Sequence, residues 1–139
     1  MLFELLTLSG VKFSGQVDEV ALTLSGGDAV ILPNHEPLTA LTLPGAVNVR
    51  TKSQEDLFVT YGGVLEVTGS HVRLLADEAE HADDLIEEEI QDAINNAKSI
   101  QAGTKDSLEL NRAQEIIDRQ IVRLNVANIR RRSKSKKIN

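Results

Sequence analysis

The stretch VALTL at residues 20–24 decides the fold class of the N-terminal part of the chain. Its larger apolar side chains, Val20, Leu22 and Leu24, occupy every second position, with smaller side chains between them. Successive side chains of a β-strand point to opposite faces, so this spacing places the three larger residues on one face. The stretch is therefore predicted to be a strand with one face buried in a core.

The same alternation recurs in the flanking sequence up to about residue 76, in short segments separated by turns. The apolar segments are Val47 and Val49, Val64 with Leu65 and Val67, and Val72 with Leu74. The turn signals between them are Pro44-Gly45, Gly62-Gly63 and Gly69-Ser70. Many short strands at turn spacing indicate a β-sandwich or a barrel.

After residue 82 the apolar period changes from two to about 3.6, which is typical of amphipathic helices. The first stripe consists of Ile86, Ile90, Ala93, Ala97 and Ile100, and the second of Leu110, Ala113, Ile117, Ile121 and Leu124. We predict one helix from about Asp84 to Gln101, capped by Asp84 and Glu87 and stopped at Gly103. A second helix is predicted to begin at a capping box of Asp106 and Glu109, which makes an antiparallel hairpin. Its alanine-rich stripes provide only modest packing energy, so the hairpin is suited to switching.

Charge divides the chain near residue 84. The net charge of −6 is the balance of −9 over residues 1–84 and +3 over residues 85–139. The last ten residues contain no acidic side chain and six basic ones, Arg130, Arg131, Arg132, Lys134, Lys136 and Lys137. We expect a negatively charged partner for this segment. We also expect its run RRRSKSKK to fray, or to become ordered only on that partner.

Composition and motifs argue against several classes of function. The absence of cysteine excludes a disulfide framework and thiolate chemistry, and no apolar run is long enough to span a bilayer, so we expect a soluble chain. The three histidines, His35, His71 and His81, form no metal-binding pattern, and no G-x-S-x-G turn presents a nucleophile. Nucleic acid is disfavoured because the rest of the chain is acidic and only 3% of its residues are aromatic.

The segment GGDAVILPNHEPL at residues 26–38 is the most unusual in the chain. Its two prolines flank Asn34-His35, which predicts a rigid, exposed bend suited to contact with a partner. Residues 31–38 resemble the Ile-Leu-Pro-x-His-x-Pro-Leu motif of the epsilon subunits of F-type ATP synthases. Further motifs follow in that family's order, namely FSGQV at 13–17, LPGAV at 43–47, YGGVLEV at 61–67 and VRLLADEAE at 72–80. The chain differs from many members at Leu8-Ser9-Gly10, where Thr-Pro is common, and at Val30, where glycine is usual.

The resemblance implies an α+β protein with a β-sandwich docking domain at residues 1–83 and a regulatory two-helix hairpin with a basic tail at residues 84–139. It implies a non-catalytic central-stalk subunit that couples rotor rotation to ATP synthesis and inhibits ATP hydrolysis through its C-terminal helices. The implied partners are the gamma subunit, the membrane c-ring, and the beta and alpha subunits of the catalytic head. The implied location is the cytoplasmic face of a bacterial plasma membrane, with the thylakoid membrane as the alternative.

The resemblance also implies functional residues in both domains. The interface with the rotor and gamma is expected at Ile31, Leu32, Pro33, Asn34 and His35. The basic residues expected to meet an acidic segment of the beta subunit are Arg123, Arg130, Arg131 and Arg132. No cofactor is required.

A second set of implied residues concerns ATP as a regulatory ligand. Glu109, Arg112 and Arg119 keep the spacing of a pattern through which some members bind ATP, with Glu109 where aspartate is usual. The two arginines lie about two helical turns apart on one face and could reach phosphate oxygens. The alternative is a solvated helix face with Glu109 as a cap.

Two rival functions come from other classes. One is a free-standing sensor whose hairpin closes on ATP and signals to an unrelated partner. The other is a small β-sandwich enzyme, which is disfavoured because no nucleophile and base converge.

Overall fold

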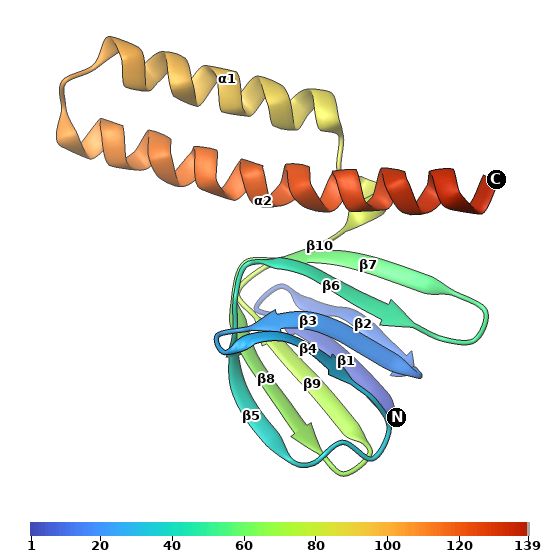
Figure 1. The fold of residues 1–139 in the computed structure, drawn as a ribbon. Coiled ribbons are helices and arrows are strands. Elements are labelled where there is room, and N and C mark those ends of the chain that lie inside the picture. The colour runs from blue at the N-terminus through green and yellow to red at the C-terminus, as the bar shows by residue number, and fades with distance from the viewer. Residues whose placement is uncertain (139) are drawn as a thin grey trace. The chain divides into compact units, whose positions relative to one another are not determined.

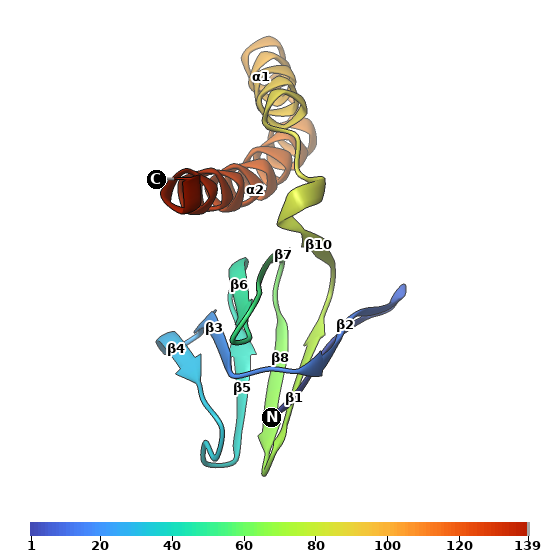
Figure 2. The ribbon, with the colours of Figure 1, turned by 90° about the vertical axis from the view of Figure 1, so that its right-hand side faces the viewer.

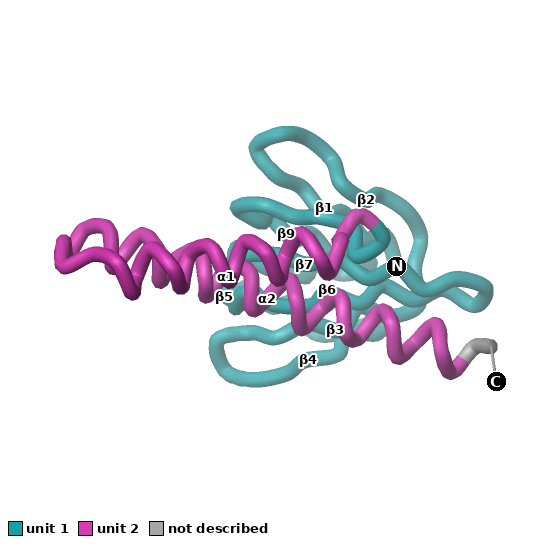
Figure 3. The backbone as a smooth tube through the Cα atoms, turned by 90° about the horizontal axis from the view of Figure 1, so that it is seen from above, with its two compact units in different colours: residues 1–83 teal, residues 84–139 magenta. Residues whose placement is uncertain are grey.

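The chain forms two units of different secondary structure in the computed structural model, which describes residues 1–138 and the side chains of residues 1–136. Unit 1, Met1–Asp83, consists mainly of strands, and unit 2, Asp84–Asn139, consists of two helices (Figure 1; Figure 3). The predicted fold class, an N-terminal β-sandwich followed by a two-helix hairpin, is confirmed. Asn139, the predicted end of the second domain, lies outside the described residues.

Unit 1 contains ten strands joined by short turns. In chain order they are β1 (Leu2–Thr7), β2 (Gly10–Gln16), β3 (Glu19–Leu24), β4 (Gly27–Ile31), β5 (Leu38–Thr42), β6 (Gly45–Arg50), β7 (Glu55–Thr60), β8 (Gly63–Thr68), β9 (His71–Ala76) and β10 (Ala79–His81). A short 3-10 helix, η1 (Ala82–Asp84), follows the last strand.

The strands form one hydrogen-bonded sheet that folds over into two layers (Figure 2). One layer runs in the order β10-β7-β6-β3, with β4 beside β3, and the other in the order β5-β8-β9-β1-β2. Neighbouring strands are antiparallel except β1 and β9, which are parallel. β3 and β5 share the single residue pair Leu24 and Thr42, so the sheet passes from one layer to the other at this point.

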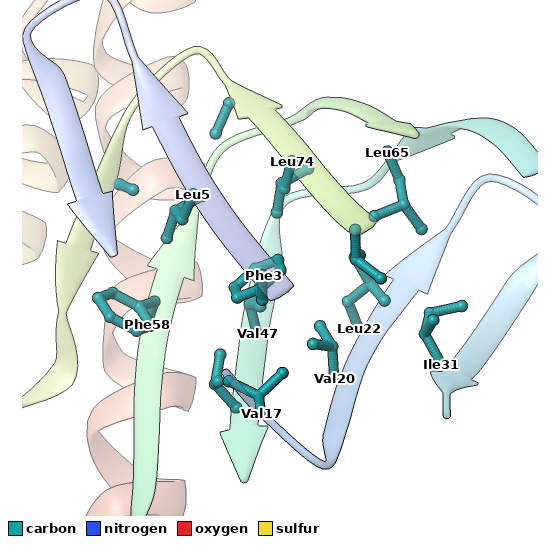
Figure 4. Close-up of a cluster of buried hydrophobic side chains, with 14 of the residues drawn as sticks. Phe3, Leu5, Val17, Val20, Leu22, Ile31, Val47, Phe58, Leu65 and Leu74 are labelled. Atoms are coloured by element: carbon teal, nitrogen blue, oxygen red, sulfur yellow. The ribbon is translucent and has the colours of Figure 1, made fainter. Parts of the chain in front are cut away.

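The core of unit 1 lies between the two layers and is largely aliphatic (Figure 4). Phe3 and Leu74 enter it from one layer, and Val20 and Leu22 enter it from the other. The alternation in residues 20–24 thus produces the predicted strand, although Leu24 is only partly buried. Each fully buried aliphatic side chain contributes about 1.5–3 kcal/mol relative to an exposed one, so this core is the main source of stability.

An ion pair joins two strands at the rim of unit 1. Arg50 Nε, at the end of β6, donates to Glu19 Oε2, at the start of β3, over 2.9 Å. This hydrogen bond lowers the pKa of Glu19 below its ordinary value. Because the folded pKa is lowered, the contribution to stability is present above the ordinary carboxyl pKa and is lost as the pH falls through the lowered one. Both side chains contact solvent, so the contribution is small.

Unit 2 is an antiparallel hairpin of α1 (Glu87–Gly103) and α2 (Ser107–Ile138). The prediction that Asp84 caps the first helix is wrong, because Asp84 ends η1 and the N-cap position falls on Ile86 without a side-chain cap. The first turn instead carries Glu87, Glu88 and Glu89, whose charges interact favourably with the positive end of the helix dipole. The helix ends at Gly103, the glycine expected to stop it and two residues beyond the predicted end at Gln101.

The start of α2 follows half of the predicted capping box. Asp106 Oδ1 accepts a hydrogen bond from the backbone N–H of Leu108 at 3.0 Å, which satisfies one exposed donor of the first turn. The carboxylate of Glu109 accepts a hydrogen bond from the hydroxyl of Thr104, and that hydroxyl in turn accepts from the backbone N–H of Asp106. The capping box predicts a direct bond from the backbone N–H of Asp106 to Glu109. In the structure the hydroxyl of Thr104 lies between them and bonds to both.

The buried stripes of the two helices differ in part from the predicted ones. On α1 the buried residues include Ile94, whereas Ile86 and Ile100 are exposed. Ile94 lies four residues after Ile90 and three before Ala97, so it sits nearer the centre of the stripe than Ala93 does. On α2 the predicted stripe residue Ile121 is exposed.

The basic end of the chain was expected to fray unless a partner was bound, and this expectation is wrong for the described residues. α2 continues without a break to Ile138. Arginine and lysine are good helix formers, and cations near a helix C-terminus interact favourably with the dipole. The side chain of Lys137 lies outside the described residues.

Candidate functional site

The predicted bend between β4 and β5 is a tight turn with a fixed backbone. The backbone N–H of His35 donates to the carbonyl of Leu32 at 3.1 Å, and Asn34 has a positive φ of 68°. Proline at the second position and asparagine with positive φ at the third are typical of a type II turn. His35 Nδ1 also donates to the carbonyl of Glu36 at 2.7 Å. The turn is therefore held in one shape by bonds on both sides of His35.

The five residues expected at the rotor interface differ in exposure. Leu32, Pro33 and Asn34 are exposed and His35 is half-buried, so these four residues present a surface. Ile31 is fully buried at the end of β4, where it packs in the core of unit 1. Ile31 therefore anchors the turn, and Leu32 is the exposed apolar side chain of the turn.

A row of apolar side chains crosses the outer face of the layer β5-β8-β9-β1-β2. Strand register places Leu41 beside Val64, Val64 beside Leu75, Leu75 beside Leu6, and Leu6 beside Val11. Their exposed fractions are 62% for Leu41, 36% for Val64, 47% for Leu75 and 63% for Val11, and Leu6 is half-buried. We call these five residues the apolar row. Contiguous exposed apolar surface is typical of sites that bind another protein or a membrane.

The apolar row was not predicted, although the sequence carries a signal for it. In Val64-Leu65 and Leu74-Leu75 two apolar residues are adjacent, so one must face outward when the other faces the core. Leu65 and Leu74 are fully buried, and this leaves Val64 and Leu75 on the outside.

Charged side chains border the apolar row on the same face. Glu4 lies beside Arg73 in the register of β1 and β9, two residues before Leu6 in the chain. Its carboxylate pairs with Arg73 Nη2 at 3.5 Å and bonds to His71 Nε2. An apolar strip with a polar border is the usual composition of a protein–protein interface.

A small buried cluster and polar contacts join the two helices of unit 2. Ala97, Ala113 and Ile117 form a small buried cluster between them. Gln101 Nε2 donates to Gln114 Oε1 at 2.9 Å, and Arg131 Nη1 pairs with Glu87 Oε2 at 3.3 Å. Two alanines bury little apolar area and the ion pair is exposed, so the hairpin gains modest energy from these contacts.

The three residues proposed for nucleotide binding all lie on α2. Glu109, Arg112 and Arg119 are exposed, and the two arginines are separated by about 10 Å along the helix axis. The Glu109 carboxylate is engaged by Thr104 at the start of the helix. The three residues form an exposed helix face. Glu109 also takes part in capping α2, as the alternative interpretation expects.

The four basic residues expected to be inhibitory have different surroundings. Arg123 is half-buried and donates to Gln120 Oε1 at 2.9 Å. Arg131 pairs with Glu87 and donates to Asn128 Oδ1 at 3.1 Å. Arg130 is half-buried and Arg132 is exposed. Arg131 and Arg132 are thus the most accessible of the four.

The described residues contain no group of three or more His, Cys, Asp or Glu side chains that could hold a metal ion. Among the same residues, neither helix combines the length and the apolar character that crossing a membrane requires.

Known proteins match the chain over most of its length. The family described as "ATP synthase, Delta/Epsilon chain, beta-sandwich domain" matches residues 1–82. The ATP synthase epsilon chain of Herpetosiphon aurantiacus is 34% identical over 128 residues, which are 92% of this chain and 94% of that one. The ATP synthase epsilon chain of Acinetobacter baylyi is 40% identical over 98 residues, or 70% of each chain.

Two solved structures share the fold at low sequence identity. A chain of the Euglena gracilis mitochondrial ATP synthase, in a structure of OSCP, F1 and the c-ring, has a TM-score of 0.70 at 17% identity. The match covers 92% of this chain and 77% of that one. A chain from the central stalk and c-ring of the Tetrahymena thermophila mitochondrial ATP synthase has a TM-score of 0.57 at 14% identity, with coverages of 91% and 96%.

Proposed function

The chain belongs to the ATP synthase epsilon chain family, and we propose that it is a structural subunit in the central stalk of a rotary F-type ATP synthase, without an active site of its own. The apolar row carries this proposal, because a folded subunit with such a surface requires a protein partner. As a member of this family the chain finds that partner within the same complex.

The proposed partners follow from the two surfaces of unit 1. The apolar row would bind the gamma subunit, and the turn at residues 32–35 would contact the c-ring of the rotor. The solved relatives come from assemblies described as F1 with the c-ring and as the central stalk with the c-ring, which supports this choice. Unit 1 would couple rotation of the ring to ATP synthesis, and the subunit would be peripheral, at the cytoplasmic face of a bacterial plasma membrane or at a thylakoid membrane.

Co-purification of the full chain with tagged gamma subunit tests this proposal. We expect the two proteins to elute together, and the c-ring to be retained with them. A chain that folds but does not bind gamma would contradict the role in the stalk. A saturable response to ATP by that unbound chain would then favour the free-standing sensor.

We further propose that unit 2 inhibits ATP hydrolysis by contacting the beta and alpha subunits of the catalytic head. Its supporting features are the small, alanine-rich buried cluster between α1 and α2 and the arginines near the end of α2. Contacts that bury mainly alanine contribute little energy each, so a hairpin can exchange them for others at low cost.

Changing Arg130, Arg131 and Arg132 together to glutamine is expected to raise ATP hydrolysis by the assembled complex about threefold to tenfold. Each exposed ion pair contributes about 0.2–1 kcal/mol, and three are lost together. Steady-state hydrolysis measures the effect, with subunit content checked by gel. Glu87→Gln is the matched control, because it removes the Arg131 ion pair inside the hairpin and keeps all three arginines. An equal rise in both variants would show that the arginines act within the hairpin and not on the head.

ATP as a regulatory ligand of the hairpin is a separate proposal, supported by the position of Arg112 and Arg119 on one exposed helix face. Titration of the full chain with ATP is expected to give a saturable change in the compactness of the two-helix hairpin. Arg112→Gln or Arg119→Gln should weaken ATP binding about tenfold or more, because each removes a charge-assisted hydrogen bond. Lys98→Gln on α1 removes the same charge and should not weaken it. Absence of a saturable response, or equal weakening by Lys98→Gln, would leave the solvated helix face as the correct interpretation.

A further inference from the structure

His81 sits where the chain leaves the sheet of unit 1. It is the last residue of β10, and its ring lies edge-on to Phe58 of β7 with 5.0 Å between the ring centroids. His81 Nε2 is 3.0 Å from Asp56 Oδ1, also on β7. On its other side, His81 Nδ1 is 3.0 Å from the backbone nitrogen of Asp83, which lies in η1. The imidazole therefore bridges a strand and the short helix that follows it.

These two contacts determine which ring nitrogen carries the proton. The backbone N–H of Asp83 can only donate, so His81 Nδ1 must offer its lone pair. The carboxylate of Asp56 can only accept when ionised, so His81 Nε2 must carry the hydrogen. The geometry is thus that of a neutral imidazole in the Nε2–H tautomer.

The Nδ1 contact acts as a side-chain cap for η1. A short helix leaves its first backbone N–H groups without partners inside the helix, and a side chain just before it can accept from one of them. His81 directly precedes η1 and accepts from the second residue of η1. Aspartate and asparagine commonly fill such a role, whereas histidine fills it only while Nδ1 is unprotonated.

Protonation of Nδ1 would place two donors opposite each other. The added hydrogen would point at the N–H of Asp83, and that hydrogen bond would be lost. The carboxylate of Asp83 is close, with Oδ2 at 3.6 Å from Nδ1, but that distance is too long for a hydrogen bond. The imidazolium would therefore draw the carboxylate inward and release the backbone, and the turn would have to rearrange.

We propose that His81 is a pH-dependent cap of the short helix η1. The neutral ring holds η1 through the Asp83 N–H, and the protonated ring releases it. Two carboxylates face the ring, Asp56 from β7 and Asp83 from η1, and both attract the imidazolium once it forms. Histidine is the residue type whose side chain can change charge between about pH 5 and 8. This cap would act on η1 whether or not unit 2 inhibits ATP hydrolysis.

NMR titration of the isotope-labelled full chain from pH 8 to pH 5 tests the cap. At pH 8 the ring nitrogen signals of His81 are expected to report the Nε2–H tautomer. On acidification the Asp83 amide proton should shift upfield with the same midpoint as the His81 ring. Its protection from exchange, relative to the intrinsic rate at each pH, should fall about fivefold, the effect of one lost hydrogen bond. His71 is an internal reference, because it bonds to Glu4 and not to this turn.

His81→Asn provides a cap that does not titrate, because its side-chain oxygen can accept from the same amide at every pH. The Asp83 amide of this variant should stay protected from pH 8 to pH 5. His81→Ala should show the unprotected amide at both ends of the range. The proposal fails if the Asp83 amide does not follow the titration of His81, if the ring is in the Nδ1–H tautomer at pH 8, or if His81→Asn retains the transition.

Discussion

Replacement of Gly63 by alanine is expected to destabilise the sandwich by about 3 kcal/mol, the upper end of the usual overpacking cost, because the added methyl group has no room. A Cβ at this position would lie 2.1 Å from the carbonyl oxygen of Leu75 and 2.8 Å from the Cα of Ala76. Both atoms belong to the backbone of β9, which is paired with β8 here, so neither can turn aside as a flexible side chain could. The strands must separate or the residue must distort.

Urea unfolding of the full chain, followed by the signal of the β-structure, measures this effect. Gly26→Ala is the matched control, because a Cβ at Gly26 would meet no atom within 4 Å. That variant should change the free energy of unfolding by less than about 0.5 kcal/mol. Equal unfolding midpoints for the two variants would show that β8 and β9 can move apart at little cost.

The strands of unit 1 could be predicted because a half-buried strand repeats every two residues. Val20 and Leu22 are buried and Ala21 between them is not, as the spacing indicates. The parallel pairing of β1 with β9 could not be predicted, because it joins segments about 70 residues apart and depends on how the whole sheet folds over. Periodicity describes each strand separately and contains no information about its neighbours.

The helical boundaries show a different limit. Asp84 and Glu87 have the spacing of a capping box, but residues 82–84 form η1, with its Asp83 N–H bonded to His81. A contact made by the preceding strand therefore displaced the helix start by three residues. The end of α1 at Gly103 needed no such contact, and it lies within two residues of the predicted end at Gln101.

The two candidate surfaces of unit 1 also differ in how far the sequence predicts them. The turn at residues 32–35 could be predicted, because proline and asparagine determine its backbone locally. The apolar row could not, because its five residues come from five strands and meet only through the register of the sheet. Adjacent apolar pairs such as Val64-Leu65 indicate single outward-facing residues, but no local pattern shows that residues of five strands form one surface.

The apolar row therefore provides the second large expected effect, on binding of the gamma subunit. Val64 lies within the row, with Leu41 on one side and Leu75 on the other. A carboxylate placed there would lose its water in the bound state without gaining a partner, which is costly. We expect Val64→Asp to raise the Kd for gamma about 30-fold, which corresponds to about 2 kcal/mol, the size of an interface hot spot.

Val30→Asp is the matched control. Val30 is also an exposed valine in a strand, 51% accessible, but it belongs to β4 in the other layer of the sheet. Both changes introduce the same charge and the same unfavourable strand residue, so their effects on folding should be similar.

Titration calorimetry with purified gamma, preceded by thermal unfolding of each variant, separates binding from folding. Only Val64→Asp should weaken the complex. If Val30→Asp weakens it equally, the contact with gamma is not confined to the layer that carries the apolar row. If neither weakens it, gamma binds elsewhere and the row serves another subunit of the stalk.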